Sequence, residues 1–144
     1  MNVFYFLKIK YMEKLFFRNG NLGLFLIRLG VGVIFIVSGW AKFMDIAGTT
    51  AFFQKIGLAS PFVYFIAALE LLGGIAILLG FWTRIFGWLL AIDMLFAIIL
   101  VKYAMGFSGY RIDLMLLLAS LGIAFTGAGN YSVCKGSRCD INGI

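Results

Sequence analysis

Four long apolar stretches separated by short polar segments dominate the hydrophobic pattern of the chain. They cover residues 22–43, 62–79, 85–105 and 108–126. As an α-helix, the second stretch would rise ~27 Å, about the thickness of the hydrocarbon core of a bilayer. The connecting segments are too short for a soluble domain, and the turn after the second stretch permits only an antiparallel return. The pattern predicts an all-α integral membrane protein, an antiparallel four-helix bundle.

The flanking segments divide the chain into three parts. We expect residues 1–21 to be an interfacial N-terminal segment, residues 22–130 a transmembrane domain and residues 131–144 a polar tail. Met12 is an alternative start, which would make the first eleven residues an extension. Residues 51–56 are apolar on one side and predict a short helix lying on the membrane. Before the second span, Ser60 is placed to cap the helix and Pro61 to occupy its first turn.

The composition supports membrane insertion and limits the kinds of metal or cofactor site that the chain can form by itself. Hydrophobic residues make up 63% of the chain and charged residues 12%, far from the balance of soluble domains. The net charge of +6 does not indicate nucleic-acid binding, because four of the basic residues precede the first span, where positive charge sets membrane orientation. These four are Lys8, Lys10, Lys14 and Arg18. With no histidine and two cysteines, most self-contained metal or haem sites are excluded.

The distribution of basic residues predicts the orientation in the membrane. The side that carries the termini and the turn at Arg84 has seven of them, whereas the opposite side has four: Lys42, Lys55, Lys102 and Arg111. We therefore expect both termini in the cytoplasm and the protein in the plasma (inner) membrane. If the chain starts at Met12, Lys8 and Lys10 are absent, and the excess of basic residues on the side of the termini is smaller.

Three ionisable residues lie inside the predicted spans, and each needs a partner in the low-dielectric interior. Counted along helices from the cytoplasmic side, Arg28, Glu70 and Asp93 lie ~9, ~13 and ~12 Å deep, nearly in one layer. We expect an Arg28–Glu70 ion pair, with Asp93 sharing the arginine or held protonated. Two interpretations stay open: a structural clamp that fixes helix register, or a clamp that also touches a substrate, proton or quinone.

Two further groups of residues are candidates. Lys42, Lys102, Tyr110, Arg111 and Asp113 gather at the opposite face, where snorkelling and interfacial anchoring are the simpler explanation. Cys134 and Cys139 in the tail are expected to be free thiols in the cytoplasm, with a redox pair as the alternative.

Small residues recur four apart within the spans. Such spacings predict close helix packing, as in Gly87-x-x-x-Ala91 and Ser120-x-x-x-Ala124. Gly73-Gly74, one turn after Glu70, is expected to leave room for Arg28 or the edge of a ligand.

An ordered set of residues in the spans and turns resembles the DoxX family, from about Leu24 to Tyr131. The set is Arg28, Gly39-x-x-Lys42, Glu70-x-x-Gly73-Gly74 and Gly80-x-x-Thr83-Arg84. Similar members often carry Gly-Tyr-Glu before the last span, whereas this chain has Gly109-Tyr110-Arg111, with Asp113 two residues on. The resemblance implies four spans and raises the expectation of quinone-linked redox work at a membrane.

Three functional hypotheses follow. In the first, the chain is a subunit of a membrane oxidoreductase complex, where Arg28, Glu70 and Asp93 handle a quinone headgroup or its protons and a partner supplies the redox cofactor. In the second, it is a structural or assembly subunit whose charges only fix packing. In the third, it is a small-solute carrier, ranked last because broken helices are not visible. The expected partners are the lipid bilayer and either another membrane protein or a second copy of the chain.

Overall fold

The computed structural model describes residues 20–103 and 106–133, and this part of the chain is helical without a strand. Predictions for the N-terminal segment, for Cys134 and Cys139 and for the rest of the tail lie outside the described residues. The elements are α2 (Gly20–Met44), α3 (Ile46–Lys55), α4 (Pro61–Leu79), α5 (Thr83–Ala97), the π-helical turn η1 (Ile98–Lys102) and α6 (Phe107–Thr126).

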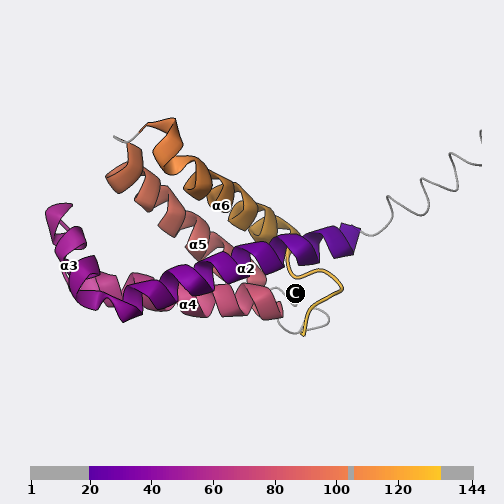
Figure 1. Ribbon diagram of the computed structural model, residues 1–144. Coiled ribbons are helices and arrows are strands. Elements are labelled where there is room, and N and C mark those ends of the chain that lie inside the picture. Colours follow the sequence, from indigo (N-terminus) through magenta and orange to yellow (C-terminus); the bar gives the residue numbers. More distant parts are fainter. Residues whose placement is uncertain (1–19, 104–105, 134–144) are drawn as a thin grey trace, which may run out of the picture.

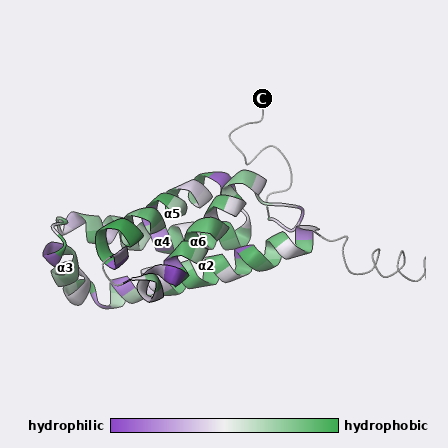
Figure 2. Cartoon of the chain, turned by 90° about the horizontal axis from the view of Figure 1, so that it is seen from above, coloured by the Kyte–Doolittle hydropathy of each residue, from purple (hydrophilic) through white to green (hydrophobic). Residues whose placement is uncertain are grey.

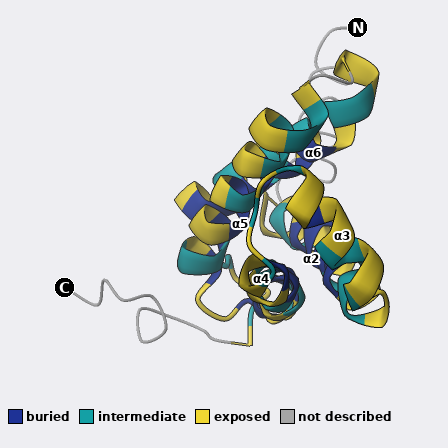
Figure 3. Ribbon diagram, turned by 90° about the vertical axis from the view of Figure 1, so that its left-hand side faces the viewer, coloured by how far each residue is buried: buried dark blue, intermediate teal, exposed yellow. Residues whose placement is uncertain are grey.

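Four helices are long and apolar enough to cross a membrane: Gly20–Met44, Pro61–Leu79, Thr83–Lys102 and Phe107–Thr126. The predicted four-helix bundle is confirmed, with span boundaries close to those expected from the hydrophobic pattern. Apolar residues cover the helices on their outer sides, and the exposed positions point away from the neighbouring helices (Figures 2 and 3). The chain is therefore a membrane protein whose outer surface contacts the lipid bilayer.

The helices form two pairs. α2 packs chiefly against α4, and α5 packs chiefly against α6, with α4 and α5 joining the pairs. The pairs meet where α4 turns into α5 and diverge toward α3, which lies at the other end of the bundle (Figure 1). We refer to these as the Arg28 end and the α3 end.

Glycines allow α2 and α4 to approach each other at backbone distance. A Cβ atom at Gly39 would lie 2.6 Å from the Leu71 nitrogen, and one at Gly74 would lie 2.8 Å from the Gly32 carbonyl oxygen. Only residues without a Cβ fit such a crossing, so these glycines fix how the two antiparallel helices are aligned. The pair α5–α6 uses the predicted small residues in the same way, because Gly87 lies against Ser120 and Ala124.

Two local predictions about α4 were wrong. Gly73-Gly74 does not make room for Arg28 or a ligand, because Leu90 of α5 and the backbone of α2 fill the space beside these glycines. Ser60 makes no capping hydrogen bond, and its backbone is already helical (φ −51°, ψ −35°). Its Oγ instead accepts a hydrogen bond of 3.1 Å from Gln54 at the end of α3. Pro61 is the first residue of α4, as predicted.

The ends of α3 and α4 have clear local causes. Asp45 accepts a 2.9 Å hydrogen bond from the Gly48 backbone N–H, so α3 begins at Ile46, several residues before the predicted start. α4 ends at Gly80, whose φ of 80° lies in the left-handed region that favours glycine. The chain then returns directly into α5, which produces the predicted antiparallel turn.

We expect Gly39→Ala to lower the stability of the bundle by ~1–3 kcal/mol, because the added methyl group meets the α4 backbone and forces the helices apart. The midpoint of thermal unfolding in detergent measures the effect. Gly30→Ala is the matched control on the same helix, since a Cβ there has nothing within 4 Å. Equal unfolding midpoints for both variants would contradict the close crossing.

Candidate functional site

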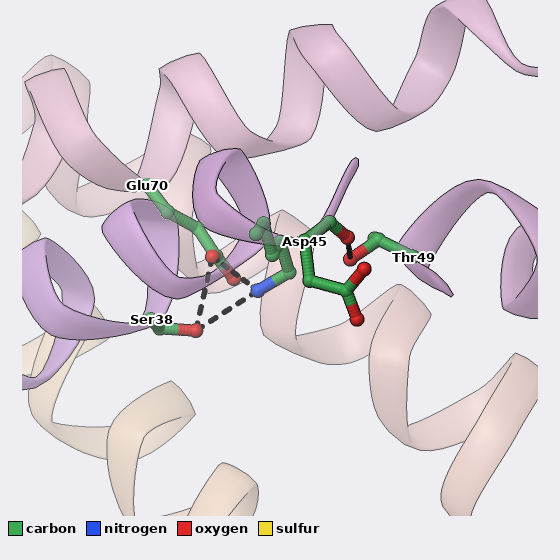
Figure 4. Close-up of polar contacts among 5 residues, drawn as sticks. Ser38, Asp45, Thr49 and Glu70 are labelled. Carbon is green, nitrogen blue, oxygen red and sulfur yellow. Dashed lines mark hydrogen bonds and ion pairs between the residues drawn. The ribbon is translucent and has the colours of Figure 1, made fainter. Parts of the chain in front are cut away.

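Glu70 lies on the face of α4 that meets α2 and is almost completely buried. Two residues of α2, one helical turn apart, reach its carboxylate. Ser38 donates a hydrogen bond of 3.0 Å to Glu70 Oε2, and the ammonium group of Lys42 forms an ion pair with the same oxygen (Figure 4). Lys42 also donates to Ser38 Oγ at 2.9 Å. The buried charge of Glu70 is thus compensated by a lysine.

The predicted Arg28–Glu70 ion pair is wrong. Arg28 is fully buried, but it lies ten residues before Ser38, ~15 Å along the same helix. Its guanidinium group donates hydrogen bonds to four carbonyl oxygens, those of Ile77 (2.9 Å), Leu78 (3.1 Å), Tyr131 (2.9 Å) and Ala128. We call this the Arg28 network.

The Arg28 network has a simple physical basis. The last carbonyl groups of a helix have no partner within the helix and carry a partial negative charge. The guanidinium group offers five N–H donors in one plane, so it can satisfy the end of α4 and the segment after α6 together. Arg28 therefore needs no carboxylate, and its position indicates a structural role at the Arg28 end.

Asp93 is the second predicted residue that the structure brings to Glu70. It comes from α5, is mostly buried, and lies close enough to interact with both Glu70 and Lys42. Its Oδ2 atom is buried without a hydrogen-bond partner in the described part of the chain. Buried polar atoms are usually satisfied, so an unsatisfied carboxylate oxygen calls for an explanation.

The second predicted group divides in two. Lys102 of η1 forms an ion pair with Asp113 of α6, with 2.6 Å between Nζ and Oδ2. Tyr110 instead packs edge-on against Phe107, with 5.6 Å between ring centroids, and Arg111 is exposed. Lys42, Lys102 and Asp113 therefore face the interior, which the anchoring interpretation does not explain.

Five charged residues line one cavity of about 310 Å³ at the α3 end. They are Lys42, Glu70, Asp93, Lys102 and Asp113. Apart from these and Ser38, the lining is apolar, with Phe35, Phe53 and Leu116 among its buried members. The volume and the few convergent polar groups are typical of a small-molecule site.

The apolar outer surface of the bundle reaches the cavity. Several of the lining residues are well exposed: Ile34, Phe52, Phe96, Leu100 and Ile112. Because exposed side chains in the spans face lipid, a hydrophobic molecule in the bilayer can approach the charged interior past this apolar rim.

The cavity is equipped for proton exchange and hydrogen bonding. Carboxylate and ammonium groups accept and donate protons, whereas electrons must come from another group. Within residues 20–103 and 106–133, no cluster of three or more metal-ligating side chains is arranged around a common point. The cavity therefore offers groups that can exchange protons and form hydrogen bonds with a small molecule.

Comparisons with known proteins agree with the fold. The sequence model of the DoxX family matches residues 23–103. A Bacillus subtilis protein named "Putative oxidoreductase CatD" is 44% identical over 112 residues, which cover 77% of this chain and 84% of that protein. The inner membrane protein YqjF of Escherichia coli is 30% identical over 117 residues, 78% of this chain and 90% of that protein.

A third relative is an uncharacterized membrane protein of Mycobacterium tuberculosis. It is 34% identical over 125 residues, covering 74% of this chain and 76% of that protein. No solved structure matches the chain.

We expect Lys42→Met to destabilise the protein, because it leaves the buried Glu70 carboxylate without its cation. Breaking a fully buried pair costs ~3–5 kcal/mol, and the loss here should be smaller since the Lys42 side chain is 23% exposed. The double variant Lys42→Met/Glu70→Gln should recover most of the loss.

The measurement is again the thermal unfolding midpoint in detergent. Lys55→Met, at an exposed lysine at the end of α3, serves as the control and should unfold like the wild type. A double variant that is no more stable than Lys42→Met alone would show that the ion pair does not carry the effect.

Proposed function

The chain belongs to the DoxX family of membrane proteins, and from that premise we propose that it is the membrane subunit of a quinone-linked oxidoreductase complex. The observation that carries the proposal is the cavity at the α3 end. It combines an apolar lining, the Lys42–Glu70 ion pair and a buried Asp93 oxygen without a hydrogen-bond partner. The name of the Bacillus subtilis relative, which includes the word oxidoreductase, supports the same direction.

A quinone headgroup matches the chemistry of the cavity. Its carbonyl oxygens accept hydrogen bonds, which the Lys42 ammonium group can donate, and its isoprenoid tail is soluble in lipid. Reduction to the quinol adds two electrons and two protons. The electrons come from a redox cofactor of a partner subunit, such as a flavin, and the protons come from the cavity carboxyl groups, which then take up protons from water.

The assignment of the proton to a residue follows from the contacts. Glu70 forms an ion pair with Lys42, and Asp113 forms one with Lys102. Asp93 contacts Glu70, but it has no ion pair in the described part of the chain, and its Oδ2 atom has no hydrogen-bond partner there. We therefore assign to Asp93 the role of the proton donor nearest to the ligand. Lys42 would orient the quinone ring.

A structural or assembly subunit is the second candidate, because specific contacts also favour it. The Lys42–Glu70 pair joins α2 to α4, and the Lys102–Asp113 pair joins η1 to α6. These contacts would fix the packing without any ligand. They do not explain why Asp93 is kept in the cavity without an ion pair, so we favour the redox subunit.

Orientation is part of the proposal. The excess of basic residues on the side of the termini supports termini in the cytoplasm, which would place the α3 end in the outer half of the membrane. We expect green fluorescent protein fused after Ile144 to fluoresce, and alkaline phosphatase fused there to be inactive. A fusion within the segment between α3 and α4, around Gly57, should give the opposite pair of results. If both pairs of fusions gave the reverse results, the termini would lie outside the cytoplasm and the proposed orientation would be wrong.

We expect the purified protein in nanodiscs to bind a short-tailed quinone such as decylubiquinone, measured by isothermal titration calorimetry. Asp93→Asn should weaken binding up to about tenfold, because it removes the carboxyl hydrogen bond to the ring, and such a bond contributes ~0.5–1.5 kcal/mol. Asp45→Asn is the matched control, since Asp45 caps α3 and does not line the cavity.

Two results would overturn the redox proposal. One is a wild-type protein that binds no quinone. The other is Asp93→Asn binding as tightly as wild type while both unfold at the same temperature. Copurification of another membrane protein without bound quinone would favour the assembly subunit.

A further inference from the structure

We propose that Asp113 and Lys102 form a proton entry for the cavity, which relays protons from water at the α3 end to Asp93. The proposal rests on the proposed function, because a cavity carboxyl that protonates a ligand must be reprotonated. It adds a role for two residues that the ligand itself does not require.

The Lys102–Asp113 pair connects the interior with the surface. Asp113 is 7% exposed, whereas the side chain of Lys102 is 35% exposed, so one partner faces the cavity and the other reaches outward. Both line the same cavity as Asp93. A purely anchoring lysine would extend to the interface, whereas this one turns back to a buried carboxylate.

The contact between the two residues is an ion pair without the alignment of a hydrogen bond. Lys102 Nζ lies 2.6 Å from Asp113 Oδ2, yet that oxygen has no geometrically acceptable hydrogen bond in the described part of the chain. A flexible four-carbon side chain held only by charge can swing to the surface and return. When it leaves, Asp113 is open to protonation from the water side.

The π-helical turn aims Lys102 at this position. An α-helix advances ~100° per residue, so the wider turn over Ile98–Lys102 rotates the residues at its end relative to a regular continuation of α5. Leu100 and Val101 of the same turn line the cavity. Local π-helical turns are frequently found at functional sites, and here the turn ends at the lysine that meets Asp113.

Charged groups reach the cavity from five elements of the bundle. The cavity receives Lys42 from α2, Glu70 from α4, Asp93 from α5, Lys102 from η1 and Asp113 from α6, while α3 contributes apolar residues. Glu70 is occupied by Lys42 and Ser38. Asp113 differs from Glu70 because its Oδ2 atom accepts no aligned hydrogen bond, so the proposed relay runs from Asp113 to Asp93 through water in the cavity.

Infrared difference spectroscopy of the protein in nanodiscs tests the relay without any quinone. The band of a protonated carboxyl group is assigned to Asp93 by its loss in Asp93→Asn. Its hydrogen–deuterium exchange is then followed after rapid mixing with heavy water. We expect Asp113→Asn to slow this exchange by about a hundredfold, as for loss of a positioned proton-transfer group.

Further variants and an added proton carrier serve as controls for this measurement. Asp113→Glu keeps a carboxyl group and should restore fast exchange. Azide, a small weak acid that can carry protons into the cavity, should also restore it in Asp113→Asn. Lys102→Gln/Asp113→Asn removes both charges together, so the slow exchange should persist even if Asp113→Asn alone folds poorly. Asp45→Asn should exchange like wild type.

Wild-type exchange in Asp113→Asn and in the double variant would overturn the relay, as would the absence of any Asp93 carboxyl band at every pH at which the protein is folded. Failure of the quinone assay leaves this measurement unaffected. Slow exchange in Asp113→Asn together with no quinone binding would keep the proton entry and remove the proposed ligand.

Discussion

The close crossing of α2 and α4 determines where the interior charges of these two helices lie. Gly39 and Gly74 bring the two backbones into contact, so the helices can be aligned in only one way. That alignment puts Arg28 beside the C-terminus of α4 and puts Ser38 and Lys42 beside Glu70. In a low-dielectric interior, an arginine or carboxylate without such a neighbour would cost several kcal/mol.

The two ends of the bundle satisfy their charges in different ways. At the Arg28 end, backbone carbonyls surround the guanidinium group, and each of its three nitrogens donates at least one hydrogen bond. At the α3 end, the helix pairs diverge, and lysine–carboxylate pairs border a cavity in which two carboxylate oxygens, of Asp93 and Asp113, have no hydrogen-bond partner within the described residues. Hydrogen-bonded packing is thus concentrated at the Arg28 end and the charged cavity at the α3 end.

The sequence predicts the elements better than their contacts. The four spans, the antiparallel turn and the start of α4 at Pro61 follow from hydrophobic runs and local turn residues. The predicted partner of Glu70 was wrong, because residue depths were counted from assumed ends of the spans. Such a count ignores how the glycines align α2 with α4. Gly32, Gly39 and Gly74 were the available signal. Lys42 was grouped with the interfacial residues and not with Glu70, because its flexible side chain bends inward from near the end of α2. The π-helical turn of η1 has no evident signature in the sequence.

The Arg28 network has a consequence for how the protein is made. α2 is the first of the four spans to leave the ribosome, but two of the acceptors of Arg28, the carbonyls of Ala128 and Tyr131, follow the last span. During synthesis, the hydrogen bonds of Arg28 to these two carbonyls can therefore form only after the last span has been made. The residues just after α6 thus complete the polar contacts of the first span, although they lie at the other end of the described chain.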